Sequence, residues 1–141
     1  MNGSYPAVFA KALCLMVCLA AATPAVAASD PAKICAEAIT RYGELYGKAP
    51  SEEPVTVVMM YKYVFCPSSV TVKVGTTVRF INIDKRTSHS VWFREEGKPE
   101  SDRLFPDEKV EMTFDHPGTY PYLCGPHWET HDMLGNIVVE P

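Results

Sequence analysis

The chain has 141 residues, of which 47% are apolar and 11% aromatic, and it carries a formal net charge of −4. A chain of this size suits one domain. Its aromatic content without an internal period excludes collagen-like, coiled-coil, repeat and disordered classes. The mildly acidic balance also excludes a nucleic-acid-binding protein, because phosphate contacts require a clustered basic face.

Residues 1–28 have the order of a secretory signal peptide. Lys11 precedes an unbroken apolar run over residues 12–22, and a stretch of small residues, 25–28, ends the segment. The run is shorter than the roughly 18 residues that a membrane-spanning helix needs. We therefore expect cleavage at the end of this segment, no membrane span, and export to the periplasm, where disulfides persist. The alternative is an uncleaved N-terminal anchor.

Residues 29–54 are predicted to form a helix and a linker. Asp30-Pro31 is typical of a helix N-cap followed by the first turn. Between residues 32 and 46, apolar side chains recur on one helical face; they are Ile34, Ala38, Ile39, Tyr42 and Tyr46. The segment 47–54 is polar and bounded by proline, which is typical of a linker. The helix either packs across one end of the following domain or anchors the chain to a larger enzyme.

Residues 55–141 are predicted to form the main domain. Short β-branched and aromatic stretches alternate with turn residues, which is the pattern of strands. We expect strands over residues 55–65, 70–74, 77–83, 88–93, 110–114, 119–124 and 134–139. The charged segment 94–107 is predicted to be a surface connection. Frequent short strands of this kind predict an all-β, Greek-key β-sandwich.

The residues that carry chemistry are Cys124, His127 and Met133, which lie between the last two predicted strands, and His89, which lies in an earlier one. Thiolate and thioether sulfur together with imidazole select copper, with two His and one Cys in a plane and a long bond to Met. We therefore expect these four residues to hold one copper ion. A nearly preformed site of this kind suits fast electron transfer.

The sequence resembles the cupredoxins, the small type 1 (blue) copper proteins such as plastocyanin, pseudoazurin and amicyanin. The resemblance covers about residues 55–141, which the likeness marks as a cupredoxin-like copper-binding domain. It is carried by the stretches 72–82, 89–91 and 117–122 and by the Cys124/His127/Met133 loop, which closes with Leu134-Gly135. It implies that His89, Cys124 and His127 are the equatorial ligands and that Met133 is the axial ligand.

The sequence departs from the cupredoxin pattern at two places. Five residues separate His127 from Met133, so this loop is longer than plastocyanin-like and amicyanin-like loops. Ser90 follows the first histidine, where asparagine is common in the family. Groups around the ligands tune a metal, so the tuning known for the family cannot be transferred to this chain.

Three further residues near the predicted site have more than one interpretation. His131 either replaces Met133 or is an exposed histidine near the site, and we favour the second interpretation. His116 is interpreted as a turn residue. Trp128 is either a core residue or part of an exposed contact patch.

Cys35 and Cys66 form the remaining even pair, because Cys124 is assigned to the metal and the other two cysteines lie in the signal segment. In an exported domain such a pair predicts a disulfide. It would join the N-terminal helix to the end of the first strand. The alternatives are two free thiols or an intermolecular bond.

These observations predict an exported, monomeric electron carrier with one type 1 copper, and not an enzyme. Neither a Ser/His/Asp set nor a carboxylate pair is evident. The expected partners are redox proteins, such as a c-type cytochrome or a periplasmic oxidoreductase, in small transient contacts. Acidic residues could steer a basic partner; they are Glu95, Glu96, Glu100, Asp102 and Glu129. The alternatives are a periplasmic copper carrier or buffer, and an accessory subunit of a larger oxidoreductase.

Overall fold

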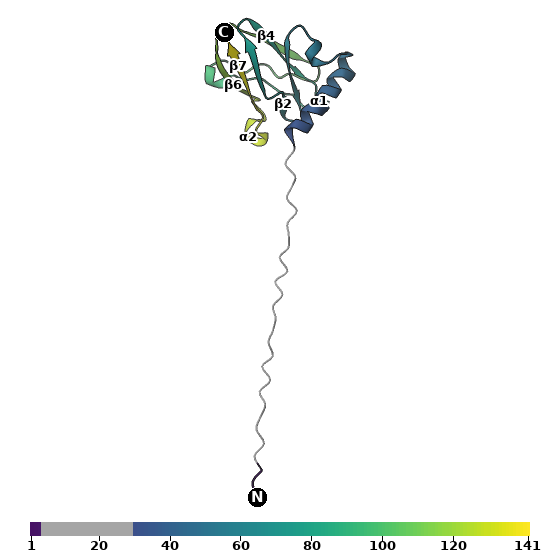
Figure 1. Cartoon of the computed structure of the whole chain (residues 1–141), viewed down its shortest axis with the longest axis vertical. Coiled ribbons are helices and arrows are strands. Elements are labelled where there is room, and N and C mark those ends of the chain that lie inside the picture. Colours follow the sequence, from purple (N-terminus) through teal and green to yellow (C-terminus); the bar gives the residue numbers. More distant parts are fainter. Residues whose placement is uncertain (4–29) are drawn as a thin grey trace.

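The computed structural model describes residues 1–3 and 30–141. The predicted signal peptide, residues 1–28, therefore lies outside the described residues apart from its first three. From residue 30 onward, two β-sheets enclose a common core and one long helix lies beside them (Figure 1). Within these described ranges, no helix is long and apolar enough to cross a membrane.

The sheets form a sandwich, which confirms the predicted all-β fold. The strands are β1 (Thr56–Tyr61), β2 (Val64–Cys66), β3 (Ser69–Lys73), β4 (Thr76–Asn82), β5 (Lys109–Phe114), β6 (Gly118–Leu123) and β7 (Leu134–Glu140). One sheet has the order β2-β1-β4-β5 and the other the order β3-β7-β6. Both sheets are mixed, because β1 pairs with β4 and β3 pairs with β7 in parallel, while the other neighbours are antiparallel.

The predicted strand over residues 55–65 is two strands, β1 and β2, joined by a tight turn. Lys62 and Tyr63 form the turn with φ angles of 47° and 64°. This left-handed region favours glycine or asparagine, and neither is present in the turn, so the sequence carries no signal for it. The turn is held from elsewhere in the fold, because the Lys62 N–H donates to the Asp84 carboxylate at 3.0 Å.

The predicted strand over residues 88–93 is also wrong. Only two isolated bridges form there, between His89 and Leu104 and between Trp92 and Leu123. The segment 94–107, predicted as a plain surface connection, supplies one of these partners and contains the short 3-10 helix η2 (Arg94–Glu96). The chain around His89 is irregular, and its backbone groups are paired partly by these bridges and partly by side chains, as where the Val91 N–H donates to the Ser101 hydroxyl.

The sandwich core lies between the two sheets. Alternate residues of the strands point into it, as in Val58 and Met60 of β1 and Val78 and Phe80 of β4. The aromatic rings of Phe80, Phe93 and Tyr122 pack edge to face or tilted, with centroids 5.1–6.1 Å apart. The candidate residues Cys124 and Met133 belong to this same cluster, so the sandwich core is continuous with the site.

A 16-residue helix, α1 (Pro31–Tyr46), covers the outer face of the β2-β1-β4-β5 sheet (Figure 1). The Asp30 side chain caps its first turn, and left-handed Gly47 ends it. Its buried residues are Ile34, Ala38 and Tyr42, which cluster with the outward side chains of β1 and β4. The helix therefore packs on a sheet face and not across an end of the sandwich.

One residue of the predicted helical face is exposed to solvent. Ile39 is 51% exposed, although its neighbour Ala38 is fully buried. Successive helical residues are rotated by about 100°. The contact stripe follows the spacing of residues 34, 38 and 42, so residue 39 falls on its flank.

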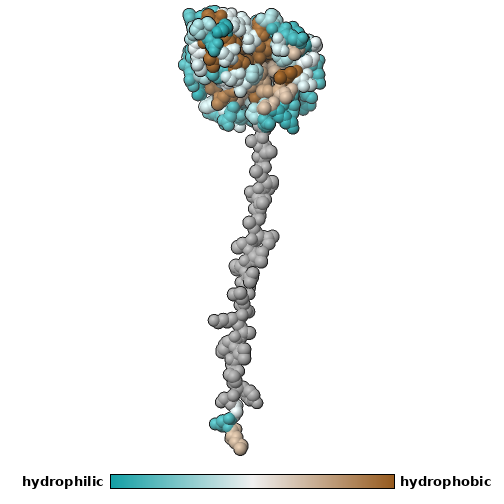
Figure 2. Space-filling view, in the orientation of Figure 1, coloured by the Kyte–Doolittle hydropathy of each residue, from teal (hydrophilic) through white to brown (hydrophobic). Residues whose placement is uncertain are grey.

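The disulfide between Cys35 and Cys66 is confirmed, and it joins α1 to the last residue of β2. Large apolar side chains on the surface are few among the described residues, and in the space-filling view apolar patches are interrupted by hydrophilic surface (Figure 2). Beyond the chain's first residue, the most exposed of them are Ile39, Leu45, Val74, Phe105 and Leu134.

Candidate metal centre

His89 is held by the irregular segment that follows β4. Its N–H donates to the Leu104 carbonyl at 3.0 Å, and the Leu104 N–H donates back at 2.8 Å. Upstream, buried Asn82 donates its side-chain amide to the carbonyls of Thr87 and Leu104, both at 2.8 Å. These bonds fix the backbone at His89 and just before it. The His89 side chain is fully buried.

Cys124 follows directly after β6, and His127 lies three residues farther along the same loop. The Cys124 N–H donates to the Met133 carbonyl at 3.1 Å, and the His127 N–H donates to the Cys124 carbonyl at 3.0 Å. Backbone hydrogen bonds within the loop thus hold both Cys124 and His127 in place. Cys124 is fully buried, and His127 is half-buried at the protein edge.

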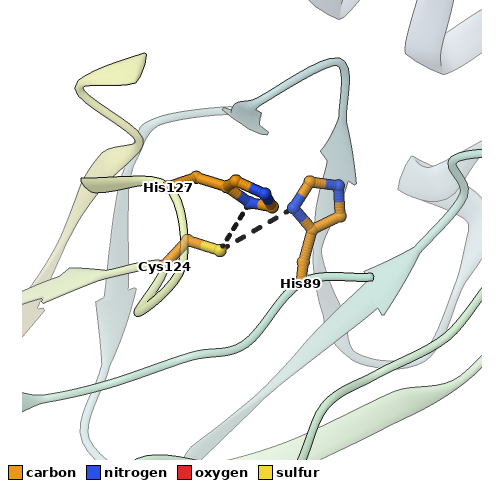
Figure 3. Close-up of side chains that lie close together, drawn as sticks. All are labelled: His89, Cys124 and His127. Carbon is orange, nitrogen blue, oxygen red and sulfur yellow. Dashed lines mark hydrogen bonds between the residues drawn. The ribbon is translucent and has the colours of Figure 1, made fainter. Parts of the chain in front are cut away.

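The structure brings three of the four predicted ligands into one cluster. The Cys124 Sγ lies 3.3 Å from the His127 Nδ1 and 3.7 Å from the His89 Nδ1 (Figure 3). All three donor atoms lie within 4.8 Å of one another. The side chains point toward a common centre from two different segments of the chain (Figure 3).

Part of the long loop between His127 and Met133 coils into a helical turn, α2 (Trp128–His131). Asp132 follows this turn in the left-handed conformation. The His131 N–H donates to the His127 carbonyl at 3.0 Å within this turn. A helix rises only about 1.5 Å per residue, so the additional residues add little to the distance that the loop covers. Met133 therefore returns to the start of the loop, where its carbonyl accepts the Cys124 N–H and its side chain is 1% exposed.

Asp84 fixes the orientation of the His89 ring. Its Oδ2 lies 3.0 Å from the His89 Nε2, which leaves the Nδ1 facing Cys124. Burial raises the pKa of Asp84, but hydrogen bonds from His89 and the Lys62 backbone outweigh burial and lower that pKa overall. A carboxylate on the far nitrogen fixes the tautomer and the direction of a ligating histidine. Sequence reasoning missed this residue, because nothing in the pattern links it to His89.

The protonation of the free donors follows from burial. Burial, together with the nearby charge of His89, lowers the pKa of His127 to about 4. The imidazole is therefore neutral at pH 7, which is the form that binds a metal. Burial raises the pKa of the Cys124 thiol, while hydrogen bonds from Ser90 oppose the rise. Metal binding here must therefore release the thiol proton.

Tyr63 is a second neighbour of the site that the sequence did not reveal. From the β1–β2 turn its ring stacks on His131, with centroids 3.9 Å apart and planes 16° apart, and it meets His127 edge-on at 4.8 Å. His131 is exposed and lies outside the three-residue donor cluster. It neighbours the site, with its ring 5.7 Å from that of His127.

Two other residues flagged in the sequence also lie outside the donor cluster. His116 is exposed, and its carbonyl accepts a hydrogen bond from the Tyr120 hydroxyl at 2.9 Å in the turn before β6. Trp128 is half-buried, and the Arg94 guanidinium covers its ring at 4.5 Å. Trp128 is thus partly covered by a charged side chain.

The donor set fits a copper ion. Two imidazole nitrogens and one thiolate sulfur, converging within 4.8 Å, are the equatorial set of a blue copper site. The buried thioether of Met133 follows on the same loop. No carboxylate joins this cluster among the described residues, so the hard, oxygen-rich set that calcium or magnesium requires is not formed here.

Residues 54–140 match the family described as copper binding proteins, plastocyanin/azurin family. The chain belongs to this family. It is 38% identical over 87 residues to a plastocyanin of Scenedesmus fuscus, covering 55% of this chain and 87% of that protein. It is 32% identical over 129 residues to amicyanin-alpha of Methylorubrum extorquens, covering 89% of this chain and all of that protein.

Solved structures give the same result for the fold. The chain superposes on an oxidized mutant of amicyanin with a TM-score of 0.57 and 31% sequence identity, covering 65% of this chain and 90% of that one. The sandwich is therefore cupredoxin-like. The family is one of blue copper electron carriers with a His-Cys-His site, and its cofactor is copper. Its plastocyanins and amicyanins are electron carriers and not enzymes.

Proposed function

We propose that this chain is an exported carrier of single electrons that holds one type 1 copper ion through His89, Cys124, His127 and Met133. The observation that carries the proposal is the convergence of the donor atoms of His89, Cys124 and His127 within 4.8 Å, next to the sandwich core. A bound copper ion would supply a one-electron couple between Cu(II) and Cu(I). The protein's own residues would keep the donor atoms in place in both states.

The surroundings of the donors support this role. Asp84 orients His89, and the Ser90 N–H donates to the Cys124 Sγ at 3.4 Å. Both ligand segments are closed by backbone hydrogen bonds. A site whose donors are fixed needs little rearrangement when the charge changes, and fast electron transfer depends on this property.

His127 is the proposed point of electron entry and exit. It is half-buried at the protein edge, whereas His89 and Cys124 are fully buried. The rings of Tyr63 and His131 lie next to His127, and the half-exposed Leu134 lines the same surface pocket as Tyr63 and His131. A redox protein, such as a c-type cytochrome or a periplasmic oxidoreductase, would meet this mixed apolar surface in a small, transient contact.

The organisation of the chain is part of the proposal. Residues 1–28 would be a signal peptide, residues 29–54 a helix and linker, and residues 55–141 the copper domain, acting as a monomer. Two observations support this division and the export. The family match begins at residue 54, and the Cys35–Cys66 disulfide suits an oxidising compartment such as the periplasm.

The decisive experiment adds Cu(II) to the purified protein and follows its optical and EPR spectra. We expect an intense visible band from the thiolate–copper bond and a reversible reduction. Cys124→Ser should abolish the band, and Met133→Leu should shift the spectrum and the reduction potential. His116→Ala serves as the matched control, because this exposed histidine lies outside the donor cluster.

Two outcomes would contradict the proposal. A colourless or redox-inert complex would instead indicate a copper carrier or buffer. A spectrum that changes in His131→Ala but not in Met133→Leu would show that the axial assignment is wrong.

A further inference from the structure

Ser90 joins the two segments that supply the predicted copper ligands. It is fully buried beside His89. Its N–H donates to the Cys124 Sγ at 3.4 Å, and its hydroxyl oxygen accepts the Gly125 N–H at 2.9 Å. One serine thus contacts both the thiol and the residue that follows it.

The Ser90 hydroxyl has one hydrogen to donate, and it goes to Glu100. The Ser90 Oγ lies 2.6 Å from the Glu100 Oε1. Hydrogen bonds of this length between a hydroxyl and a carboxylate are charge-assisted and roughly twice as strong as neutral ones. The carboxylate therefore fixes the hydroxyl in the orientation that leaves its oxygen free to accept the Gly125 N–H.

Glu100 is also placed directly over the cysteine loop. A Cβ atom at residue 125 would overlap the Glu100 carboxylate. The carboxylate thus occupies the space that a side chain at residue 125 would need. This close approach brings a negative charge next to the Cys124 segment.

The neighbouring residues secure Glu100 in this position. The Val91 N–H donates to the Ser101 hydroxyl at 2.9 Å, and the Ser101 N–H donates to the Val91 carbonyl at 3.0 Å. Residues 100–101 are therefore bonded to residues 90–91 side by side. Glu100 is exposed but is held at a fixed point of the backbone.

We propose that Glu100 is a positioning residue for the metal centre. Acting through Ser90, it fixes the Cys124–Gly125 segment against the His89–Ser90 segment, and its charge favours the oxidised state of a bound copper ion. The second part of this inference rests on the proposed function, and the first does not. The exposed acidic side chain thus has a role beyond charging the surface.

Two measurements test the positioning role and the charge role of Glu100 separately. Amide hydrogen exchange on the metal-free protein reports on the Gly125 N–H, and voltammetry on the copper-loaded protein reports on the potential. We expect Glu100→Ala and Ser90→Ala each to speed Gly125 exchange on the order of tenfold, as loss of one hydrogen bond would. The double variant should add little to Ser90→Ala, because both act through one chain of bonds.

Glu100→Gln tests the charge alone, because its amide oxygen can still accept from Ser90. We expect it to raise the reduction potential and to leave Gly125 exchange nearly unchanged. Glu96→Gln is the matched control, since it removes the same charge from an exposed position in η2. Equal potentials in these two variants would overturn the charge role, and unchanged Gly125 exchange in Glu100→Ala would overturn the positioning role. If the wild type shows no reversible copper couple, the proposed function fails, while the exchange data still decide the positioning role.

Discussion

Single side chains in this protein are held by partners that are distant in the sequence. Asp84 receives the Lys62 N–H from the β1–β2 turn and contacts the far nitrogen of His89 with the same oxygen. Through this one carboxylate, the turn that presents Tyr63 and the histidine beneath it are positioned together. Removing a partner of such a group costs more than the bond itself, because the remaining buried group loses its hydrogen bond.

Glu53 plays a similar part away from the site and makes the fold sensitive to acid. Hydrogen bonds from Tyr42 and Lys48 lower its pKa to about 2, aided by the charge of Arg79. Because this pKa is lower in the folded state, ionised Glu53 stabilises the fold above its ordinary pKa of 4.5, and the stabilisation is lost as the pH falls toward 2. We expect Glu53→Gln to lower the free energy of unfolding at pH 7 and to flatten its decline in acid.

Urea unfolding at a series of pH values checks this prediction. Glu44→Gln is the control, because Glu44 is an exposed carboxylate on α1, the helix that carries Tyr42. Curves of stability against pH that run parallel for wild type and Glu53→Gln would show that the Glu53 contacts do not contribute.

At the scale of elements, one helical turn adapts the ligand loop to the sandwich. The turn α2 and left-handed Asp132 take up the additional loop residues, so that the Met133 carbonyl still meets the Cys124 N–H. The glycine at residue 135 is explained by sterics. The Tyr122 ring, opposite Gly135 in β6, occupies the space where a Cβ atom would lie. Glycine at residue 135 is therefore a packing requirement.

The disulfide connects two elements that are far apart in the chain. Cys35 in α1 and Cys66 in β2 lie 31 positions apart in the sequence, and closing a loop of that size stabilises a fold by about 3–4 kcal/mol in the chain-entropy model. We expect the metal-free double variant Cys35→Ala/Cys66→Ala to lose a free energy of unfolding of this size. Equilibrium denaturation measures it, and mild reduction of the wild type should reproduce the loss. An unchanged denaturation midpoint after reduction would contradict the prediction.

At the scale of the whole molecule, β1 is shared by two apolar clusters. Val58 and Met60 face the sandwich core, while Val57, Met59 and Tyr61 face α1. The sequence of a strand that is buried on both faces is a continuous apolar run and does not alternate between apolar and polar residues. Because the clusters share this strand, the helix and the sandwich should unfold as one cooperative unit.

A pair of adjacent helix substitutions tests this unity. Ala38→Glu places a charge in the fully buried face against the sheet, whereas Ile39→Glu changes a residue that is 51% exposed. We expect the first to lower the free energy of unfolding by about 3 kcal/mol or more and the second by less than about 0.5 kcal/mol. Circular dichroism and tryptophan fluorescence should show coincident transitions in both. Loss of helix signal before the sandwich unfolds would show that α1 is an independent appendage.

The sequence by itself determined the β-sandwich and the N-terminal helix. It predicted, but did not determine, the Cys35–Cys66 disulfide and the His89/Cys124/His127 cluster, both of which the structure shows. Alternation and turn residues are local patterns. The ligand set follows from the cupredoxin resemblance, and Cys35 and Cys66 are the pair that remains once the other cysteines are assigned. The sequence also placed Met133 on the ligand loop, although its role as the axial ligand stays a proposal.

Only the tertiary structure decided the parts that depend on long-range contacts. The Lys62–Tyr63 turn carries no glycine or asparagine, and it exists because Asp84 accepts a backbone N–H from across the fold. The link from Glu100 through Ser90 to Gly125 joins residues that no periodicity connects. Hydrophobic patterning acts along the chain and selects elements, whereas a buried polar group must find its partner wherever the packed backbone supplies one.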